Sequence, residues 1–232
     1  MKRLGILGGM GPAASAEFIT RLIDLTPATC DQEHVPFVLW SDPTVPDRST
    51  SLINRDDFPW DKLKQGILGL KSAGCDHIAI PCNTAHFWYD RMAQLGIPIT
   101  HIIGSVADEL KELKVYSGAI GIIGTKATMR LGLYQDYLNK QGWSCVTPGS
   151  QDIDNFVQPA IDLIKANDVD AARDLLYQVI DNLKKSGVKA IVLGCTELPL
   201  AIKDKTYKNI PIVNSIDSLV KSVIIKHKRQ LY

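Results

Sequence analysis

The sequence has no excess of charge of either sign and no long hydrophobic run. Of its 232 residues, 26 are Lys or Arg and 25 are Asp or Glu, and no basic tract stands out. A role in binding nucleic acid or an anionic membrane surface therefore has no electrostatic support. No apolar stretch approaches the ~20 residues of a membrane-spanning helix. The glycines at positions 8 and 9 interrupt the first apolar stretch too early for a signal peptide. We therefore expect a cytoplasmic protein with neither nucleic acid nor membrane as a partner.

Cysteine and histidine are sparse and scattered. The five cysteines are odd in number and widely spread, which predicts free thiols rather than a disulfide framework. No His/Cys spacing typical of a metal site occurs, because four of the five histidines lie far apart in the first half. No lysine motif for pyridoxal phosphate is recognisable. We expect neither a metal ion nor an organic cofactor.

Short apolar runs alternate with longer amphipathic stretches, which predicts an α/β fold with mainly parallel sheets. Several runs are continuously apolar, as expected for strands covered on both faces. The predicted strands are residues 4–7, 36–40, 77–81, 97–102, 119–123, 190–193 and 210–213. The predicted helices are residues 13–25, 60–72, 126–141, 155–165 and 171–185. Residues 40–58 lack periodicity and are predicted to form a long loop, which in a compact domain is often functional.

The sequence contains an internal repeat: three short segments of the first half, here called echoes, recur in the second half. GILG at residues 5–8 recurs as GIIG at 121–124, and IPI at 97–99 recurs as IPI at 210–212. The segment that ends in IAIPCNT at 78–84 is matched by IVLGCT at 191–196. The three echoes keep the same order and lie 113 to 116 positions apart, close to half the chain. We interpret them as two similar three-layer α/β halves related by a pseudo-twofold axis.

The echo places one cysteine at the same point of each half. Cys82 and Cys195 each follow an apolar strand directly and precede the next helical segment. Ligands of open α/β sheets bind at the carboxyl ends of strands. If the halves face each other, the two thiols lie on opposite walls of one interdomain cleft, and the sequence therefore predicts the active site there.

Two opposed thiols suit the inversion of a stereocentre that carries a hydrogen. One residue removes a proton from one face while the other delivers a proton to the opposite face, and the two exchange roles with substrate handedness. A thiol can take both roles because its free pKa is ~8.5 and a polar site can lower it. Backbone N–H groups at a strand-to-helix turn can also receive a substrate carboxylate.

Polar neighbours complete the predicted site. Asn83, Thr84 and Thr196 bring short polar side chains beside the thiols. Glu197 follows Cys195 by two residues and is a candidate for setting its protonation. Thr125 and Thr128 begin the helix after the strand that mirrors the first one, so they are expected to line the same cleft.

At these residues the chain resembles the aspartate/glutamate racemase superfamily, in particular its aspartate racemase branch. The motifs are GGMGP at residues 8–12, PCNT at 81–84 and GCTE at 194–197, and the likeness runs through essentially the whole chain. The glutamate racemase branch typically has Asp-Ser-Gly after the first strand and His after the second Cys-Thr, where this chain has Gly-Met-Gly and Glu197. A further branch has Thr in place of the first cysteine and prefers one enantiomer, which Cys82 disfavours here.

The resemblance implies a cofactor-independent racemase of aspartate, usually dimeric, with an acidic amino acid as its small-molecule partner. It implies that Arg48 binds the side-chain carboxylate, that Lys165 gives a second cationic contact and that Met10 lines the substrate site. By analogy Cys195 attacks the L-substrate and Cys82 the D-substrate. Because the C-terminal segment of such folds returns to the first domain, residues 1–100 with 210–232 are predicted to form one domain and residues 101–209 the other.

Other functions stay open at this point. A broader range of acidic amino acids, or another isomerase of the superfamily, fits the same cysteines. The residues GMGPAA at 9–14 formally satisfy the G-x-G-x-x-A pattern of NAD(P)-dependent oxidoreductases. The acidic residue that this pattern needs is displaced, because Asp42 lies 31 positions beyond Gly11. A non-catalytic binding protein for acidic amino acids would use the cleft equally well, although binding alone needs no pair of thiols.

Overall fold

The computed structural model describes residues 3–229, and the chain divides into two compact units. The first unit holds the residues up to Ser105 and those from Ile216 onward, and the second holds Val106–Ser215. The division falls within helix α5 (Ile102–Glu112) and at the start of helix α12 (Ser215–Lys228). Residues 1–2 and 230–232, which belong to the predicted first domain, lie outside the described residues.

The first unit is built on a four-stranded sheet in the order β2-β1-β3-β4, in which every pair is parallel. Its strands are β1 (Leu4–Gly8), β2 (Phe37–Ser41), β3 (His77–Ala79) and β4 (Ile99–Thr100). Its helices are α1 (Pro12–Leu25), η1 (Asp31–Glu33), α2 (Arg48–Asn54), α3 (Pro59–Ser72), η2 (Thr84–Trp88) and α4 (Tyr89–Ala93), with part of α5 and most of α12. Strand β1 is buried along its whole length, as expected for a strand covered on both faces.

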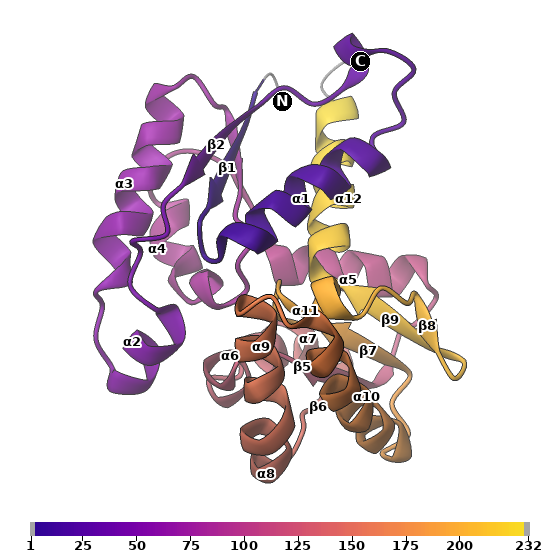
Figure 1. Cartoon of the computed structure of the whole chain (residues 1–232). Coiled ribbons are helices and arrows are strands. Elements are labelled where there is room, and N and C mark those ends of the chain that lie inside the picture. Colours follow the sequence, from indigo (N-terminus) through magenta and orange to yellow (C-terminus); the bar gives the residue numbers. More distant parts are fainter. Residues whose placement is uncertain (1–2, 230–232) are drawn as a thin grey trace. The chain divides into compact units, whose positions relative to one another are not determined.

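Within the first unit, an ion pair joins helix α12 to helix α1. The Arg21 guanidinium, on α1, donates to both carboxylate oxygens of Asp217, with its Nε 2.7 Å from Oδ1 and its Nη2 2.9 Å from Oδ2. Figure 1 shows α1 and α12 side by side. A two-point bond of this kind fixes orientation as well as distance. It therefore sets how the last helix lies against the first one.

The second unit has a five-stranded sheet in the order β6-β5-β7-β9-β8, parallel except for its edge strand β8. Its strands are β5 (Gly118–Ile123), β6 (Trp143–Val146), β7 (Ala190–Leu193), β8 (Thr206–Tyr207) and β9 (Ile210–Asn214). Its helices are α6 (Lys126–Arg130), α7 (Leu133–Asn139), α8 (Ser150–Asp152), η3 (Ile153–Val157), α9 (Gln158–Lys165), α10 (Val169–Lys185) and α11 (Leu198–Ala201).

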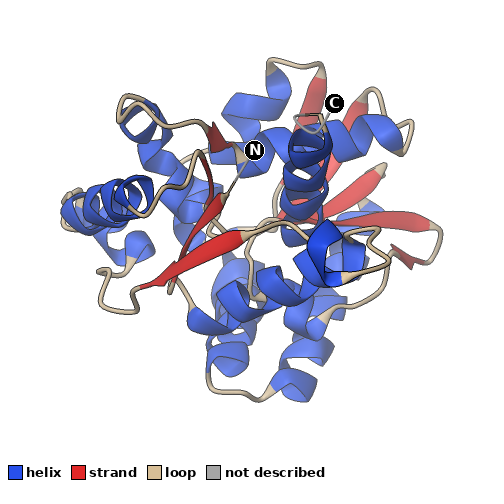
Figure 2. Ribbon diagram, turned by 90° about the horizontal axis from the view of Figure 1, so that it is seen from above, coloured by secondary structure: helices blue, strands red, loops and turns tan. Residues whose placement is uncertain are grey.

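The two sheets share one strand order. In each unit the second strand lies at one side of the first, the third lies at its other side, and a further parallel strand, β4 or β9, lies beside the third. Within each unit, helices cover the strands, as Figure 2 shows. The predicted α/β fold with two mainly parallel sheets is confirmed, and the sequence echo reflects this shared order.

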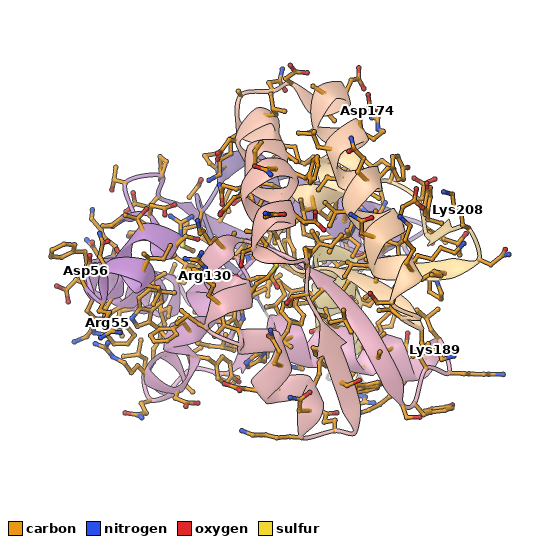
Figure 3. The ribbon with its side chains drawn as sticks, turned by 90° about the horizontal axis from the view of Figure 1, so that it is seen from below. Arg55, Asp56, Arg130, Asp174, Lys189 and Lys208 are labelled. Carbon is orange, nitrogen blue, oxygen red and sulfur yellow. The ribbon has the colours of Figure 1, made fainter. Side chains whose placement is uncertain are left out.

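Helix α10 illustrates how the sequence specifies these elements. Its buried positions recur at helical spacing and form one apolar stripe: Ala172, Leu176, Val179, Ile180 and Leu183. Asp168 caps the helix by accepting from the backbone N–H of Ala171, and two lysines complement the dipole in the last turn. Figure 3 shows Asp174 on the outer side of α10, while Lys208, at the tip of the β8–β9 hairpin, is paired with Asp181 of α10 at 2.7 Å.

Several sequence-based assignments differ from the structure, among them that of residues 101–105, which were assigned to the second domain and belong to the first unit. Residues 40–58 are not a continuous loop, because α2 forms within them, capped by the Asp47 carboxylate accepting from the Thr50 N–H at 2.7 Å. The single helix predicted for residues 126–141 is two helices, because Gly132 has a φ of 69° and breaks the regular backbone. Residues 210–214 were assigned to the first domain, yet β9 pairs with β7 and so joins the second sheet.

Several elements have no counterpart among the predicted ranges. They include the strands β6 and β8 and the helices α5 and α12. Strand β6 reads Trp-Ser-Cys-Val and mixes polar with apolar residues, so its pattern is weak. None of the described helices is long and apolar enough to cross a membrane.

The packing of α3 on the first sheet gives a stability prediction. A Cβ at Gly69 would lie 2.4 Å from Cζ3 of the Trp40 ring, closer than packed atoms allow. Overpacking in Gly69→Ala should lower the free energy of unfolding by about 1–3 kcal/mol. The higher helix propensity of alanine, worth ~1 kcal/mol, offsets only part of this loss. Urea unfolding measures this change. Lys64→Ala, at an exposed position of the same helix, is the control and should change stability by less than about 0.5 kcal/mol. A Gly69→Ala protein as stable as the wild type would contradict the packing argument.

Candidate active site

Each sheet has a topological switch point between its first and third strands. From β1 the chain goes to β2 on one side and later to β3 on the other, and β5, β6 and β7 repeat this course. The loops that leave the first and third strands therefore diverge, and open α/β sheets bind their ligands at such a point, at the carboxyl ends of the strands. The GGMGP loop and the Cys82 turn flank this point in the first unit. Thr125 and the Cys195 turn flank it in the second.

The loop after β1 is held in place by a serine on α1. The Gly9 N–H donates to Ser15 Oγ at 2.9 Å, and the Ser15 hydroxyl donates to the Gly11 carbonyl at 2.9 Å. Gly9 has a φ of 90°, and a Cβ there would lie 2.5 Å from the backbone of Asp42, which follows β2. Only glycine fits this close approach. Met10, predicted to line the site, is buried in this loop.

Arg48 fastens the same loop to the one after β2. Its Nη2 donates to the Met10 carbonyl at 3.0 Å, and its Nη1 donates to the carbonyls of Val45 and Pro46 at 3.3 and 3.2 Å. A guanidinium carries five N–H donors, so these bonds use three of them. Within the described part of the chain, Nε is buried and has no hydrogen-bond partner. Arg48 is thus partly engaged by backbone and retains donor capacity.

The Cys82 turn lies in a buried stretch. The Cys82 N–H donates to the Ile80 carbonyl at 2.8 Å, and Cys82, Asn83 and Thr84 are all buried at the start of η2. His86, one turn further on, contacts the Cys82 carbonyl through Nδ1 at 2.9 Å. The predicted polar neighbours Asn83 and Thr84 are therefore buried together with Cys82 in the same turn.

Three histidines of the first unit are held neutral. Burial lowers the pKa of His86 to about 4 and that of His101 to about 3. Burial, and next the charge of Lys226, lower the pKa of His77 to about 4. His86 and His101 lie together, with ring centroids 5.0 Å apart. His77 bonds elsewhere, to the Thr100 hydroxyl at 2.6 Å.

In the second unit the thiol meets a carboxylate. The Cys195 thiol donates to Glu197 Oε2 at 2.9 Å, and the Thr196 hydroxyl donates to the same oxygen at 3.4 Å. All three side chains are buried, and Cys195 is 3% exposed. The three predicted residues of the GCTE motif are therefore in direct contact. A carboxylate that accepts from the thiol stabilises the protonated form of the sulfur.

The Cys195 turn is held by a backbone hydrogen bond and by close packing at Gly194. The Gly194 N–H donates to the Ile123 carbonyl at 2.7 Å, and a Cβ at Gly194 would lie 2.8 Å from Cε2 of Tyr134. Thr125 caps α6, with its Oγ1 accepting from the Thr128 N–H at 3.2 Å and bonded to the Thr128 hydroxyl at 2.9 Å. The two predicted threonines are therefore bonded to each other beside the switch point.

Lys165 is placed less closely than the other predicted residues. It ends α9 and its side chain is exposed. The residues before it, Ile161 and Ile164, pack in the same apolar cluster as Cys195 and Leu198. Lys165 therefore lies on a helix that packs by the Cys195 turn, but no bond ties it to the predicted residues of its unit.

Residues outside the predicted site set support the site, and of these the sequence gives a role only to His86, as support for the helix start after Thr84. Ser15 holds the glycine loop, His86 contacts the Cys82 backbone and Tyr134 packs on Gly194. Tyr134 is fully buried, and burial raises its pKa. The short spacing from Cys82 to His86 and the small-residue pattern at 9–15 were available signals. Nothing in the local sequence marks Tyr134.

Cys75 and Cys145 lie outside these loops, and the side chain of Asp42 is bonded to other partners. Burial raises the pKa of the Cys145 thiol to about 11 and also raises that of Cys75. Asp42, the acidic residue that a dinucleotide site would require, accepts from the Thr44 hydroxyl at 2.6 Å and pairs with Lys62 at 3.5 Å. Among residues 3–229, no three His, Cys, Asp or Glu side chains gather in a way that could hold a metal ion.

Comparisons with known proteins agree with this architecture. Residues 7–223 match the model of the family described as Asp/Glu/Hydantoin racemase. The broad specificity amino-acid racemase RacX of Bacillus subtilis is 30% identical over 230 residues, which cover 95% of this chain and 96% of that protein. The structure of Picrophilus torridus aspartate racemase superposes with a TM-score of 0.84 at 33% identity, covering 98% of this chain and 94% of that one.

A glutamate racemase of Persephonella marina is 28% identical over 169 residues, which cover 70% of this chain and 61% of that protein. The fold and the matched length together define an α/β protein of the racemase class. The chain belongs to the Asp/Glu/Hydantoin racemase family.

The neutral histidines give a pH prediction. Their pKa is 6.5 in the unfolded chain and about 3 to 4 in the folded one, so below pH 6.5 the unfolded state binds more protons. Stability should be complete above pH 6.5 and fall as the pH decreases toward 4, by up to about 1.4 kcal/mol per pH unit for each histidine. Urea unfolding between pH 7.5 and 5 measures the slope. His77→Gln should flatten it, and an unfolding free energy independent of pH would contradict the assignment.

Proposed function

We propose that this racemase interconverts L- and D-aspartate without a cofactor, with the thiols of Cys82 and Cys195 acting on opposite faces of one α-carbon. The observation that carries the proposal is topological. Each cysteine follows the third strand of a sheet, and the two sheets share one strand order. A chain that repeats its fold and places one thiol at each switch point provides a matched pair of acid and base.

The proposed reaction moves two protons. A thiolate takes the α-proton, so that an S–H bond forms as the C–H bond breaks and the electron pair moves into the substrate carboxylate. The opposite thiol then gives its proton to the other face of the same carbon, so that a C–H bond forms and a thiolate remains. After the α-proton has left, the α-carbon is planar and the negative charge on the substrate carboxylate is greater. Backbone N–H groups at strand-to-helix turns are suited to stabilise this charge.

Glu197 supports an assignment of the resting protons. Its carboxylate accepts from the Cys195 thiol at 2.9 Å, which stabilises the protonated sulfur. In the resting protein Cys195 then acts as the acid and Cys82 as the base. By the family analogy, this resting form accepts D-aspartate, and one turnover leaves the protein in the form that accepts L-aspartate.

Arg48 supports a substrate with a second carboxylate. Its guanidinium is anchored to three backbone carbonyls, while its buried Nε lacks a partner in the described chain. An unsatisfied buried donor costs about 1–3 kcal/mol, and an incoming carboxylate would remove that cost. Lys165, exposed at the end of α9, is proposed as a second cationic contact. The likeness to a racemase of broad specificity makes a wider substrate range the alternative.

The two-thiol proposal is tested by hydrogen exchange. L-Aspartate incubated with the protein in heavy water should gain deuterium at Cα while its optical rotation decays, with no cofactor added. Cys82→Ala and Cys195→Ala should each reduce racemisation by at least about a thousandfold, because either face then lacks its proton carrier. Proton NMR and polarimetry follow the two signals.

Cys75→Ala and Cys145→Ala are matched controls, since each removes a covered or half-buried thiol from one unit without touching the turns. Both should retain racemisation. Full activity in either Cys82→Ala or Cys195→Ala would refute the two-thiol mechanism. Exchange with alanine or serine as fast as with aspartate would favour the broad-range alternative.

The role of Arg48 is tested by substrate comparison. Arg48→Lys keeps the charge but loses the planar fork, so kcat/KM for aspartate should fall by about tenfold to a hundredfold, and that for alanine by much less. Arg55→Asn is the control, because Arg55 is exposed at the end of the same helix and has a φ of 61°, which asparagine tolerates. Equal losses for aspartate and alanine would show that Arg48 only holds the loops.

A further inference from the structure

We infer that His86 is a positioning residue for Cys82, acting through the Cys82 backbone carbonyl rather than through the substrate. The inference rests on the proposed function of Cys82. It starts from the two ring nitrogens, each of which has a partner. Nδ1 lies 2.9 Å from the Cys82 carbonyl oxygen, and Nε2 lies 3.2 Å from the Ile102 backbone nitrogen.

The bonds to Cys82 and Ile102 are satisfied together by one tautomer, and the Thr100 backbone also lies within bonding reach of the ring. A carbonyl oxygen can only accept, so Nδ1 carries the hydrogen and donates to Cys82. A backbone N–H can only donate, so Nε2 must be the unprotonated nitrogen that accepts from Ile102. A charged imidazolium would place two donors against each other at Ile102. Burial, which lowers the pKa of His86 to about 4, keeps the ring in the neutral form that this geometry needs.

The bond to the Cys82 carbonyl also orients the next peptide group. The peptide between Cys82 and Asn83 is trans, since the cis peptide among the described residues is Met10–Gly11. In a trans peptide the C=O and the N–H point in opposite directions. By holding the Cys82 carbonyl, His86 therefore aims the Asn83 N–H away from the ring. The same bond limits rotation about the backbone that carries the Cys82 sulfur.

The far side of the ring is anchored to a rigid element. Ile102, Ile103 and Gly104 offer the first N–H groups of α5, which have no partner within the helix. His86 accepts from the first, and His101 Nδ1 accepts from the other two at 3.2 and 3.3 Å. The Cys82 turn is thus tied through one imidazole to the start of an 11-residue helix.

The two contacts of His86 can be removed separately. Counted along the side chain, the amide nitrogen of asparagine lies as far from Cα as Nδ1, and the amide of glutamine lies as far as Nε2. His86→Asn therefore keeps a donor for the Cys82 carbonyl and loses the bond to Ile102. His86→Gln keeps an acceptor for the Ile102 N–H and leaves the Cys82 carbonyl without its donor.

We expect His86→Asn to keep kcat for aspartate within about threefold of the wild type. His86→Gln should lower kcat by about tenfold to a hundredfold with KM little changed, because a small misplacement of a reacting group is costly. A second readout does not need turnover. In His86→Gln, alkylation of Cys82 by iodoacetamide, followed by peptide mass spectrometry, should slow by more than threefold, while alkylation of Cys195 stays unchanged.

His77→Asn and His77→Gln are the matched controls, because His77 is buried in the same unit but bonds to the Thr100 hydroxyl. Both should lower the melting temperature and leave the alkylation ratio of Cys82 to Cys195 unchanged. Equal kcat and equal Cys82 alkylation in the two His86 variants would overturn the inference. If the wild type racemises no amino acid, the proposed function fails, and the alkylation contrast still decides the role of His86.

Discussion

The direction of the strands is the constraint on which the rest of the structure depends. In each sheet the first and third strands are neighbours and run parallel, so their carboxyl ends meet at one edge. The chain leaves β1 and β3, or β5 and β7, toward different sides, and open α/β sheets bind their ligands where the chain diverges in this way. Glycines then allow close packing, as Gly9 does against the backbone of Asp42 and Gly194 does against the ring of Tyr134.

The two cysteine turns share a position but not an environment. Cys195 meets an acidic side chain directly, through the bond from its sulfur to Glu197. The carbonyl of Cys82 is held by the neutral imidazole of His86. A racemase must process both mirror images of its substrate, a task that two identical turns would suit. The structure instead controls one turn through the charge near the sulfur and the other through the position of the backbone.

The sequence predicts much of this arrangement because parallel strands carry strong signals. The apolar runs of β1 and β7, and the repeated cysteine after the third strand, were enough to place both turns. Helix α2 was missed because its seven residues show no apolar period, and its start depends on a cap from Asp47. Gly132 could be recognised as a break only from its positive φ. The contact between His86 and Ile102 joins residues 16 positions apart and depends on the fold.

Arg48 combines two tasks that are usually assigned to different residues. It braces the loop after β1 through the Met10 carbonyl, and it is the proposed anchor of a substrate carboxylate. Substrate selectivity and the conformation of residues 9–11 therefore cannot change independently during evolution. A descendant that gives up acidic substrates by replacing this arginine must also find a new brace for residues 9–11, so changes at position 48 should be accompanied by changes in that loop.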